Sequence, residues 1–196
     1  MSGTGNAANG LARTPIKGIL GIPGRVASPA RTFPQPEPPL MSMPETGSPA
    51  PEFDLPANGG RRIALSDLRG GPVVLFLYPR DDTSGCTAEA KDFTALKPAF
   101  DAEGATLLGL SKDSVAKHEK FIAKHDLGVD LLSDEQDETV EAYGAWVEKS
   151  MYGRKFMGIE RTTFLIDSDG IIRRIWRKVK VKGHAEEVLE AVRALT

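Results

Sequence analysis

The sequence of 196 residues contains a single cysteine, Cys86, and this scarcity excludes several kinds of site. One thiol cannot form a disulfide within the chain, nor can it build a zinc site from several thiolates. Chains without disulfides are typical of reducing compartments, so we expect the protein in the cytoplasm. His118 and His125 could share a helix face, but no set of acidic or cysteine ligands accompanies them. We interpret them as parts of a solvated helix face, and we predict no metal site and no cofactor.

Long hydrophobic runs are also missing. The longest run, at residues 72–78, is far shorter than the roughly 20 residues that a membrane-spanning helix needs. Glycine and proline interrupt the apolar residues of "IKGILGIPG" near the start, which argues against a signal peptide. The net charge of −2 shows no excess of basic residues. We therefore expect a soluble protein that has neither a membrane nor a nucleic acid as its partner.

The first 40 residues differ in composition from the rest of the chain. The first 60 residues hold 11 of the 14 prolines, and residues 1–40 carry four basic residues but one acid, Glu37. A segment so poor in large apolar side chains cannot offset its conformational entropy by burial, so we predict that residues 1–40 are a disordered extension. We favour a dispensable extension, such as one from an early start codon, over an organelle transit peptide, because proline and glycine break amphipathic helices.

Residues 41–196 are predicted to form one domain in which strands and helices alternate. The apolar run at residues 71–78 is typical of a central strand covered on both faces. Pro98 is expected to interrupt the first helix, and Asp113 or Ser111 to cap the second. Hydrophobic periodicity predicts strands near residues 53–55, 61–65, 71–78, 105–111, 129–134, 161–167 and 170–177, and helices near 86–97, 114–126, 135–143 and 184–195. The pattern indicates an α/β fold with a mixed central sheet flanked by helices.

Cys86 lies where the apolar strand passes through a polar turn into a helix, in "LFLYPRDDTSGCTAEAKDF". The thiolate is the nucleophilic form, and a free cysteine thiol has a pKa of about 8.5, so a reactive cysteine needs its charged form stabilised. Helix N-termini offer unpaired N–H groups, and Thr83 could add a hydroxyl hydrogen bond. Asp81 and Asp82 oppose a thiolate, so at least one should point away or pair with a cation. Free cysteines are often simply buried, so the residues alone leave both a structural and a reactive thiol open.

The segment "YPRDDTSGCTAEA" resembles the active-site loop of peroxiredoxins of the bacterioferritin-comigratory, or peroxiredoxin Q, type. The family pattern Pro-x-x-x-Thr-x-x-Cys falls on Pro79, Thr83 and Cys86. "PEFDLPANGGRRIALSDLRGGPVVLFLYPRD" is similar to the family's opening hairpin and first core strand, and "YGAWVEKSMYGRKFMGIERTTFLIDSDGIIRRIWRKVKVKGHAEEVL" to its C-terminal half. The resemblance covers roughly residues 41–195, and it implies a thioredoxin-like fold and a thiol peroxidase activity.

The resemblance also implies roles for five residues. Cys86 would be the peroxidatic cysteine, which attacks the terminal peroxide oxygen and becomes a sulfenic acid. Thr83 would hydrogen-bond the thiolate and the peroxide, and Pro79 would shield the sulfenate from solvent. Arg161 would support the thiolate and the developing negative charge, while Glu89 would hold the arginine in place. Without the resemblance, Arg161 would be interpreted as a solvated residue at the start of a strand.

Two positions depart from the family's pattern. Many members carry a resolving cysteine five residues after the peroxidatic one, where this chain has Lys91. Because no other cysteine exists, the resemblance implies a one-cysteine mechanism in which an external thiol, such as thioredoxin, glutaredoxin or glutathione, reduces the sulfenic acid. Ser84 stands where the family usually has proline, which could loosen the loop. We expect a monomer or a weak homodimer.

Two other functions remain open. Without a resolving cysteine, the protein could be a peroxide sensor that forms mixed disulfides with partner proteins. A cysteine hydrolase would need a base, but the three histidines lie far along the chain in helix-like contexts. One of them, His184, opens the last predicted helix, where we interpret it as a structural cap. Our leading prediction is a peroxidase that reduces hydrogen peroxide and organic hydroperoxides in antioxidant defence and cell redox homeostasis.

Overall fold

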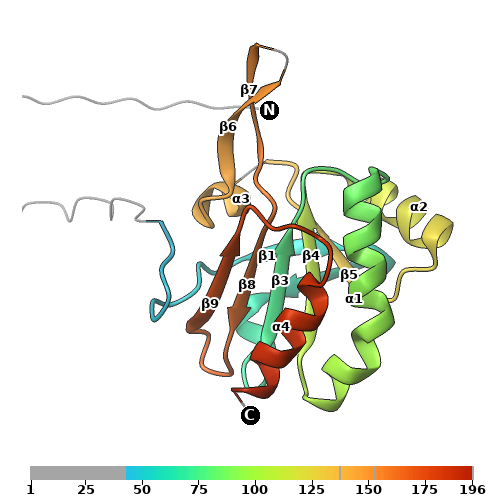
Figure 1. Ribbon diagram of the computed structural model, residues 1–196. Coiled ribbons are helices and arrows are strands. Elements are labelled where there is room, and N and C mark those ends of the chain that lie inside the picture. The colour runs from blue at the N-terminus through green and yellow to red at the C-terminus, as the bar shows by residue number, and fades with distance from the viewer. Residues whose placement is uncertain (1–42, 137, 152, 196) are drawn as a thin grey trace, which may run out of the picture. The chain divides into compact units, whose positions relative to one another are not determined.

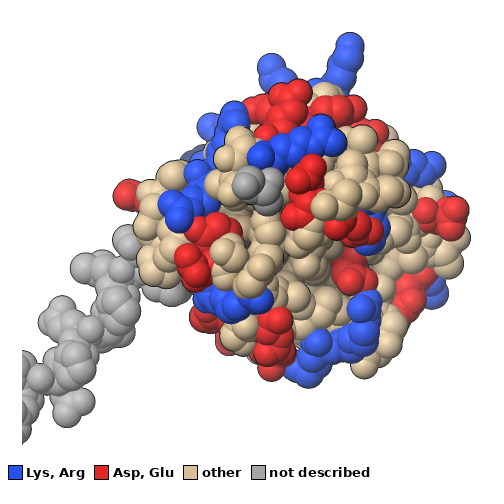
Figure 2. All heavy atoms as spheres, turned by 90° about the horizontal axis from the view of Figure 1, so that it is seen from below, with Lys and Arg blue, Asp and Glu red and all other residues tan. Residues whose placement is uncertain are grey.

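The computed structural model describes residues 43–136, 138–151 and 153–195. All of them belong to one compact unit, Pro39–Thr196. The predicted extension, residues 1–40, lies outside the described residues, so its disorder stays a prediction. Within the described part, no helix is long and apolar enough to cross a membrane. On the face seen in Figure 2, acidic and basic side chains alternate without a continuous patch of one sign.

A mixed sheet of seven strands forms the centre of the domain (Figure 1). Its strands are β1 (Asp54–Ala57), β2 (Arg61–Ala64), β3 (Val73–Leu77), β4 (Thr106–Ser111), β5 (Asp130–Ser133), β8 (Thr162–Ile166) and β9 (Ile172–Arg177). They follow the order β2-β1-β5-β4-β3-β8-β9. Strands β3, β4 and β5 run parallel, whereas β8 and β9 are antiparallel to their neighbours. The predicted strands and the mixed sheet are therefore confirmed, with small shifts at the strand ends.

The sheet is covered on both faces, as the apolar run at residues 71–78 predicts. Along β3, Val74 and Phe76 face one cluster of buried side chains, while Val73 and Leu75 face another, because side chains alternate along a strand. The first cluster includes residues of three helices, and Figure 1 shows two of these, α1 and α4, side by side over the sheet. The helices are α1 (Ser84–Ala102), α2 (Val115–His125), α3 (Glu138–Ala142) and α4 (His184–Arg193), and short 3-10 turns lie at Asn58–Gly60 and Leu65–Leu68.

The prediction that Pro98 interrupts the first helix is wrong. Helix α1 continues through Pro98 to Ala102. A proline inside a helix removes one backbone hydrogen bond, here the one to the carbonyl of Thr94. Beyond the proline, the ring of Phe100 is fully buried and packs against Phe93 with ring centroids 6.0 Å apart. Burial of a phenylalanine contributes about 1.5–3 kcal/mol, enough to offset much of the cost of the proline.

The predicted caps of the second helix are also wrong. The N-cap residue of α2 is Ser114, and its side chain makes no capping hydrogen bond. The carboxylate of Asp113 instead accepts hydrogen bonds from the backbone N–H of Asp81 at 2.7 Å and from Lys117 Nζ at 3.1 Å. The Ser111 hydroxyl donates to the same carboxylate at 3.2 Å. Asp113 therefore ties α2 to the loop after β3 rather than capping the helix.

A hairpin of two strands, β6 (Trp146–Met151) and β7 (Arg154–Ile159), was not predicted. It forms a separate two-stranded sheet, and Figure 1 shows it projecting beyond the end of the central sheet. Its residues mix charged and apolar side chains without the regular alternation that identifies a strand. The hairpin leads directly into β8. It therefore lies near the end of the sheet at which β3 ends and the loop after β3 begins.

The topology brings two distant segments to one end of the sheet. The chain leaves β3 at Leu77 and reaches α1 through residues 78–83. Because β8 is antiparallel to β3, its first residue, Thr162, pairs with Leu77. The residue before β8, Arg161, therefore lies beside the start of α1, although 75 residues separate it from Cys86.

Candidate active site

Cys86 lies in the first turn of α1 and only 1% of its surface is exposed. Its Sγ accepts a hydrogen bond from Nη2 of Arg161 at 3.2 Å. The N–H groups in the first turn of a helix have no partners within the helix and carry partial positive charge. A guanidinium N–H and a helix N-terminus are two of the features that stabilise thiolates in proteins.

Glu89 holds the other side of the same guanidinium, because its Oε2 accepts a hydrogen bond from Nη1 of Arg161. Glu89 follows Cys86 by three residues, so both side chains lie on one face of α1. Burial raises the pKa of Glu89 to about 7, although the charge of Arg161 acts in the opposite direction. Burial alone would lower the pKa of Arg161, but the charges of Glu89 and Cys86 outweigh it and hold that pKa above its ordinary value. Arg161 therefore stays cationic between two acidic groups.

One oxygen of Glu89 is left without a partner. Its Oε1 is buried and has no hydrogen-bond partner among the described residues. Unsatisfied buried polar atoms are rare in native structures, and a catalytic role is one explanation for them. This orphan oxygen is consistent with the raised pKa of Glu89, since a partly protonated carboxyl is easier to bury than a carboxylate.

Pro79 and Thr83 lie in the loop between β3 and α1, and both are exposed. The hydroxyl of Thr83 donates to the carbonyl of Arg80 at 3.2 Å. The hydrogen bond to Cys86 that the sequence left open is thus not formed in this structure. Thr83 remains close in the chain, as the N-cap residue of the helix that carries Cys86. The side chain of Thr83 must rotate before its hydroxyl can donate a hydrogen bond to the sulfur of Cys86.

Both aspartates of the loop are paired, as the sequence requires for a thiolate nearby. Asp82 forms an ion pair with Lys124 Nζ at 2.5 Å and a hydrogen bond with His125 Nε2 at 2.7 Å. Hydrogen bonds from these two residues lower the pKa of the Asp82 carboxyl. Asp81 accepts a hydrogen bond from the Tyr78 hydroxyl at 2.7 Å. The prediction that at least one aspartate pairs with a cation is confirmed.

The interpretation of His118 as part of a solvated helix face is wrong, because its surface is 0% exposed. Its Nδ1 lies 2.8 Å from Asp81 Oδ2, and its Nε2 lies 3.0 Å from the carbonyl oxygen of Leu132. A carbonyl only accepts, so Nε2 carries a hydrogen. His118 is spaced three residues from both Val115 and Phe121, which places it on the apolar face of α2, and that spacing could have predicted its burial. Through these two hydrogen bonds, the imidazole on α2 connects the loop before Cys86 to β5.

The interpretation of His184 as a cap is also wrong. The N-cap residue of α4 is Gly183, and His184 is buried. Its ring packs edge-on against Phe93 and Trp176, and its Nε2 lies 2.8 Å from the Thr163 hydroxyl. Burial lowers the pKa of His184 to about 4, so the imidazole is neutral near pH 7. It is a core residue that joins α4 to β8.

The burial of His184 predicts a pH dependence of stability. Its folded-state pKa of about 4 lies below the ordinary 6.5, so the unfolded chain binds more protons between these pH values. Its contribution to the free energy of unfolding should therefore decrease as the pH falls from about 6.5 to 4, by up to about 3 kcal/mol. Urea unfolding of the wild type and of His184→Gln, measured at pH 4, 5, 6 and 7, checks this.

The comparison of the two proteins isolates His184 from other titrating groups. Glu89 acts in the opposite sense, because its raised pKa of about 7 makes the folded state the better proton binder above pH 4.5. That effect is common to both proteins and cancels in their difference. The stability advantage of the wild type should shrink towards pH 4, and an advantage that stays constant with pH would contradict the prediction.

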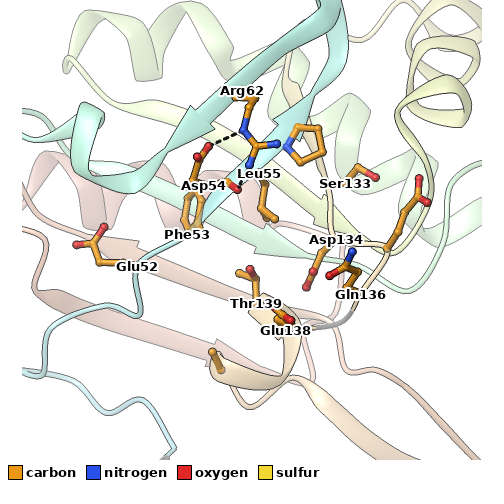
Figure 3. Close-up of a pocket in the computed structure, with 13 residues that line it drawn as sticks. Glu52, Phe53, Asp54, Leu55, Arg62, Ser133, Asp134, Gln136, Glu138 and Thr139 are labelled. Carbon is orange, nitrogen blue, oxygen red and sulfur yellow. Dashed lines mark hydrogen bonds and ion pairs between the residues drawn. The ribbon is translucent and has the colours of Figure 1, made fainter. Parts of the chain in front are cut away.

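A groove among the described residues lies away from this site. It has a volume of about 650 Å³ and lies between the first two strands and the connection from β5 to α3 (Figure 3). Asp54, Asp134, Glu135 and Glu138 line it, and its one cation, Arg62, is directed at Asp54. None of Cys86, Glu89 and Arg161 belongs to its lining. An acidic groove repels thiolates, so we assign it no part in the cysteine chemistry.

Comparisons with known sequences agree with the geometry. Residues 46–175 match the AhpC/TSA family. A putative peroxiredoxin Bcp of Coxiella burnetii is 48% identical over 145 residues, which cover 74% of this chain and 96% of the relative. Peroxiredoxin Bcp of Bacillus subtilis is 43% identical over 152 residues, covering 78% and 97% of the two chains.

Solved structures show the same fold. One is a structure of Xanthomonas campestris bacterioferritin comigratory protein, from work on its alkyl peroxide reduction activity. It matches this chain with a TM-score of 0.70 at 44% identity, covering 72% of this chain and 90% of the other. A cysteine-to-serine mutant of Xylella fastidiosa PrxQ gives a TM-score of 0.74 at 39% identity, with coverages of 78% and 98%. The predicted thioredoxin-like fold is thus confirmed. The chain belongs to the AhpC/TSA family, as a peroxiredoxin of the Bcp, or peroxiredoxin Q, type, and it is a thiol peroxidase.

Proposed function

We propose that the protein reduces hydrogen peroxide and organic hydroperoxides through Cys86 alone, and that an external thiol completes the cycle. The observation that carries this proposal is the hydrogen bond from Arg161 to the buried sulfur, with Glu89 on the far side of the guanidinium. A cation so placed favours the thiolate before the reaction and the negative charge that spreads over sulfur and both peroxide oxygens during it.

In the oxidation step, the Cys86 thiolate attacks the terminal oxygen of the peroxide. An S–O bond forms as the O–O bond breaks, and the leaving oxygen takes a proton and departs as water or an alcohol. Cys86 becomes a sulfenic acid. Thr83 turns its hydroxyl from the Arg80 carbonyl towards the thiolate and the peroxide, and Pro79 shields the sulfenate from solvent.

In the reduction step, an external thiol attacks the sulfenic acid, which releases water and leaves a mixed disulfide. A second thiol then releases the Cys86 thiolate and carries away the disulfide. The position that often holds a resolving cysteine is occupied by the exposed Lys91, and the chain has no other cysteine. Thioredoxin, glutaredoxin and glutathione are the candidate reductants, for a monomer or weak homodimer that serves antioxidant defence and redox homeostasis in the cytoplasm.

One observation favours the alternative of a peroxide sensor. Because only 1% of Cys86 is exposed, a protein thiol reaches its oxidised sulfur slowly unless the first turn of α1 opens. An oxidised form that persists could pass its oxidation to a specific partner protein as a mixed disulfide. A protein that is oxidised rapidly but not turned over by any of the three reductants would support this alternative.

Stopped-flow mixing with hydrogen peroxide tests the proposal. Cys86 should be oxidised orders of magnitude faster than free cysteine, with one oxygen atom added per chain by mass spectrometry. Each reductant is then supplied separately, in excess, to measure turnover. A rate of oxidation no higher than that of free cysteine would refute the peroxidase proposal.

A further inference from the structure

The β6–β7 hairpin brings a second cation to the site of Cys86. Lys149 lies on β6, opposite Phe156 on β7, and its side chain is partly buried. Its Nζ donates a hydrogen bond to the backbone carbonyl of Ile159, three residues further along β7 than its pairing partner. Ile159 is buried, and Arg161 follows it by two residues. The lysine side chain therefore runs along the hairpin towards the end of β7, which Arg161 follows by two residues.

Gly158 marks the path of this side chain. Gly158 lies two residues after Phe156, so both face the same side of the hairpin as Lys149. A Cβ at Gly158 would lie 3.6 Å from Cδ of Lys149 and 3.5 Å from Cε2 of Phe156. The aliphatic stem of the lysine thus passes directly over the glycine, with Phe156 beside it. Such packing directs the ammonium to the base of the hairpin rather than into solvent.

The hydrogen bond of Nζ to the Ile159 carbonyl places the ammonium two residues before Arg161 in the chain. Burial lowers the pKa of Lys149, and the positive charge of Arg161 adds to this effect. The negative charges of Glu160 and Cys86 act in the opposite direction. Lys149, held at Ile159, is thus coupled to the charge of Cys86, whose sulfur accepts the hydrogen bond from Arg161.

Glu89, Asp92 and His184 are further ionisable groups coupled to this site. Asp92 interacts electrostatically with Glu89, and His184 with Arg161. Glu89 offsets part of the charge of Arg161 through their ion pair. The sulfur thus shares Arg161 with the carboxylate of Glu89. A second cation would further stabilise the thiolate form of Cys86.

We propose that Lys149 is a positioning residue of the peroxidase site, whose ammonium favours the thiolate of Cys86 and fixes the backbone at residues 159–161 from which Arg161 extends. The proposal deepens, and rests on, the proposed role of Cys86. It also gives the hairpin a function, since the hairpin supplies a cation that the central sheet does not carry. Lys155, on the same hairpin, is a matched contrast, because its side chain is 73% exposed and pairs with Glu148 at 2.9 Å.

The pH dependence of alkylation tests the proposal. Iodoacetamide is neutral and reacts with the thiolate form of cysteine. Because Cys86 is the only cysteine in the sequence, the rate of alkylation reports on Cys86 alone. In Lys149→Met the midpoint of the pH–rate curve should move up by about 0.5–1 pH unit, because a nearby positive charge is lost. Lys149→Arg should restore most of the shift, and Lys155→Met should behave as the wild type.

A second variant separates charge from structure. Lys149→Gln keeps a shorter N–H donor directed at the Ile159 carbonyl but has no charge, so it should show the same upward shift as the methionine variant while losing less of the wild-type melting temperature. A midpoint unchanged in both uncharged variants, or an equal shift in Lys155→Met, would overturn the proposal. Alkylation needs no peroxide, so a failure of the proposed peroxidase activity would appear separately, in the stopped-flow experiment.

Discussion

Cys86→Ser is expected to reduce peroxide turnover to the uncatalysed background while leaving the fold intact. A serine hydroxyl does not ionise near neutral pH and no general base lies beside it among the described contacts of Cys86, so no nucleophile remains. The hydroxyl is slightly smaller than the thiol and can accept the same hydrogen bond from Arg161. Peroxidase assays with each reductant and thermal unfolding measure the two parts of this prediction.

Cys86→Ala provides the matched control. It removes the nucleophile and also the acceptor of the Arg161 hydrogen bond, so it should be equally inactive but less stable than the serine variant, by about 1 kcal/mol. Turnover that persists in Cys86→Ser would place the chemistry elsewhere in the chain and refute the role of the cysteine.

Arg161→Ala is expected to slow the oxidation of Cys86 by hydrogen peroxide by about 10²–10³-fold, the effect typical of removing one preorganised donor from a developing negative charge. It also deprives Glu89, which is 1% exposed, of its cation. Removing one partner of a buried ion pair costs about 3–5 kcal/mol when the remaining group stays charged. Because burial already raises the pKa of Glu89 to about 7, the carboxyl can escape this cost by binding a proton. The loss of stability should therefore be larger at pH 8 than at pH 6.

The double variant Arg161→Ala/Glu89→Gln separates rate from stability. Glutamine removes the unpaired buried charge, so the double variant should recover stability at pH 8 relative to Arg161→Ala, but not the rate of oxidation. Stopped-flow oxidation and urea unfolding at the two pH values measure both quantities. An oxidation rate equal to that of the wild type would mean that Arg161 has only a structural role.

Much of the fold could be predicted from the sequence because its central elements carry strong local signals. The apolar run at residues 71–78 is enough to predict β3 as a central strand. The errors arise where tertiary packing overrides a local rule. Buried Phe100 carries α1 past Pro98, and the β6–β7 hairpin forms from a segment without regular alternation.

The site was harder to predict than the fold. The position of Cys86 between a strand and a helix could be read from the residues, but the choice of Arg161 and Glu89 came from the family resemblance. No local pattern links residues 75 positions apart; only the pairing of β3 with β8 brings them together. Lys149 was missed for the same reason. His118 was misjudged although its spacing on α2 pointed inwards.

The pairing of β3 with β8 also sets the order in which the protein becomes reactive during its synthesis. Arg161 leaves the ribosome 75 residues after Cys86, a delay of roughly 4–15 s at about 5–20 residues per second. Throughout that interval the nascent chain carries a cysteine without its arginine, because the strand that delivers the arginine has not yet been made. The thiol can gain its arginine only after 161 of the 196 residues have been translated, so the chain is expected to react with peroxide at full rate only near the end of its synthesis.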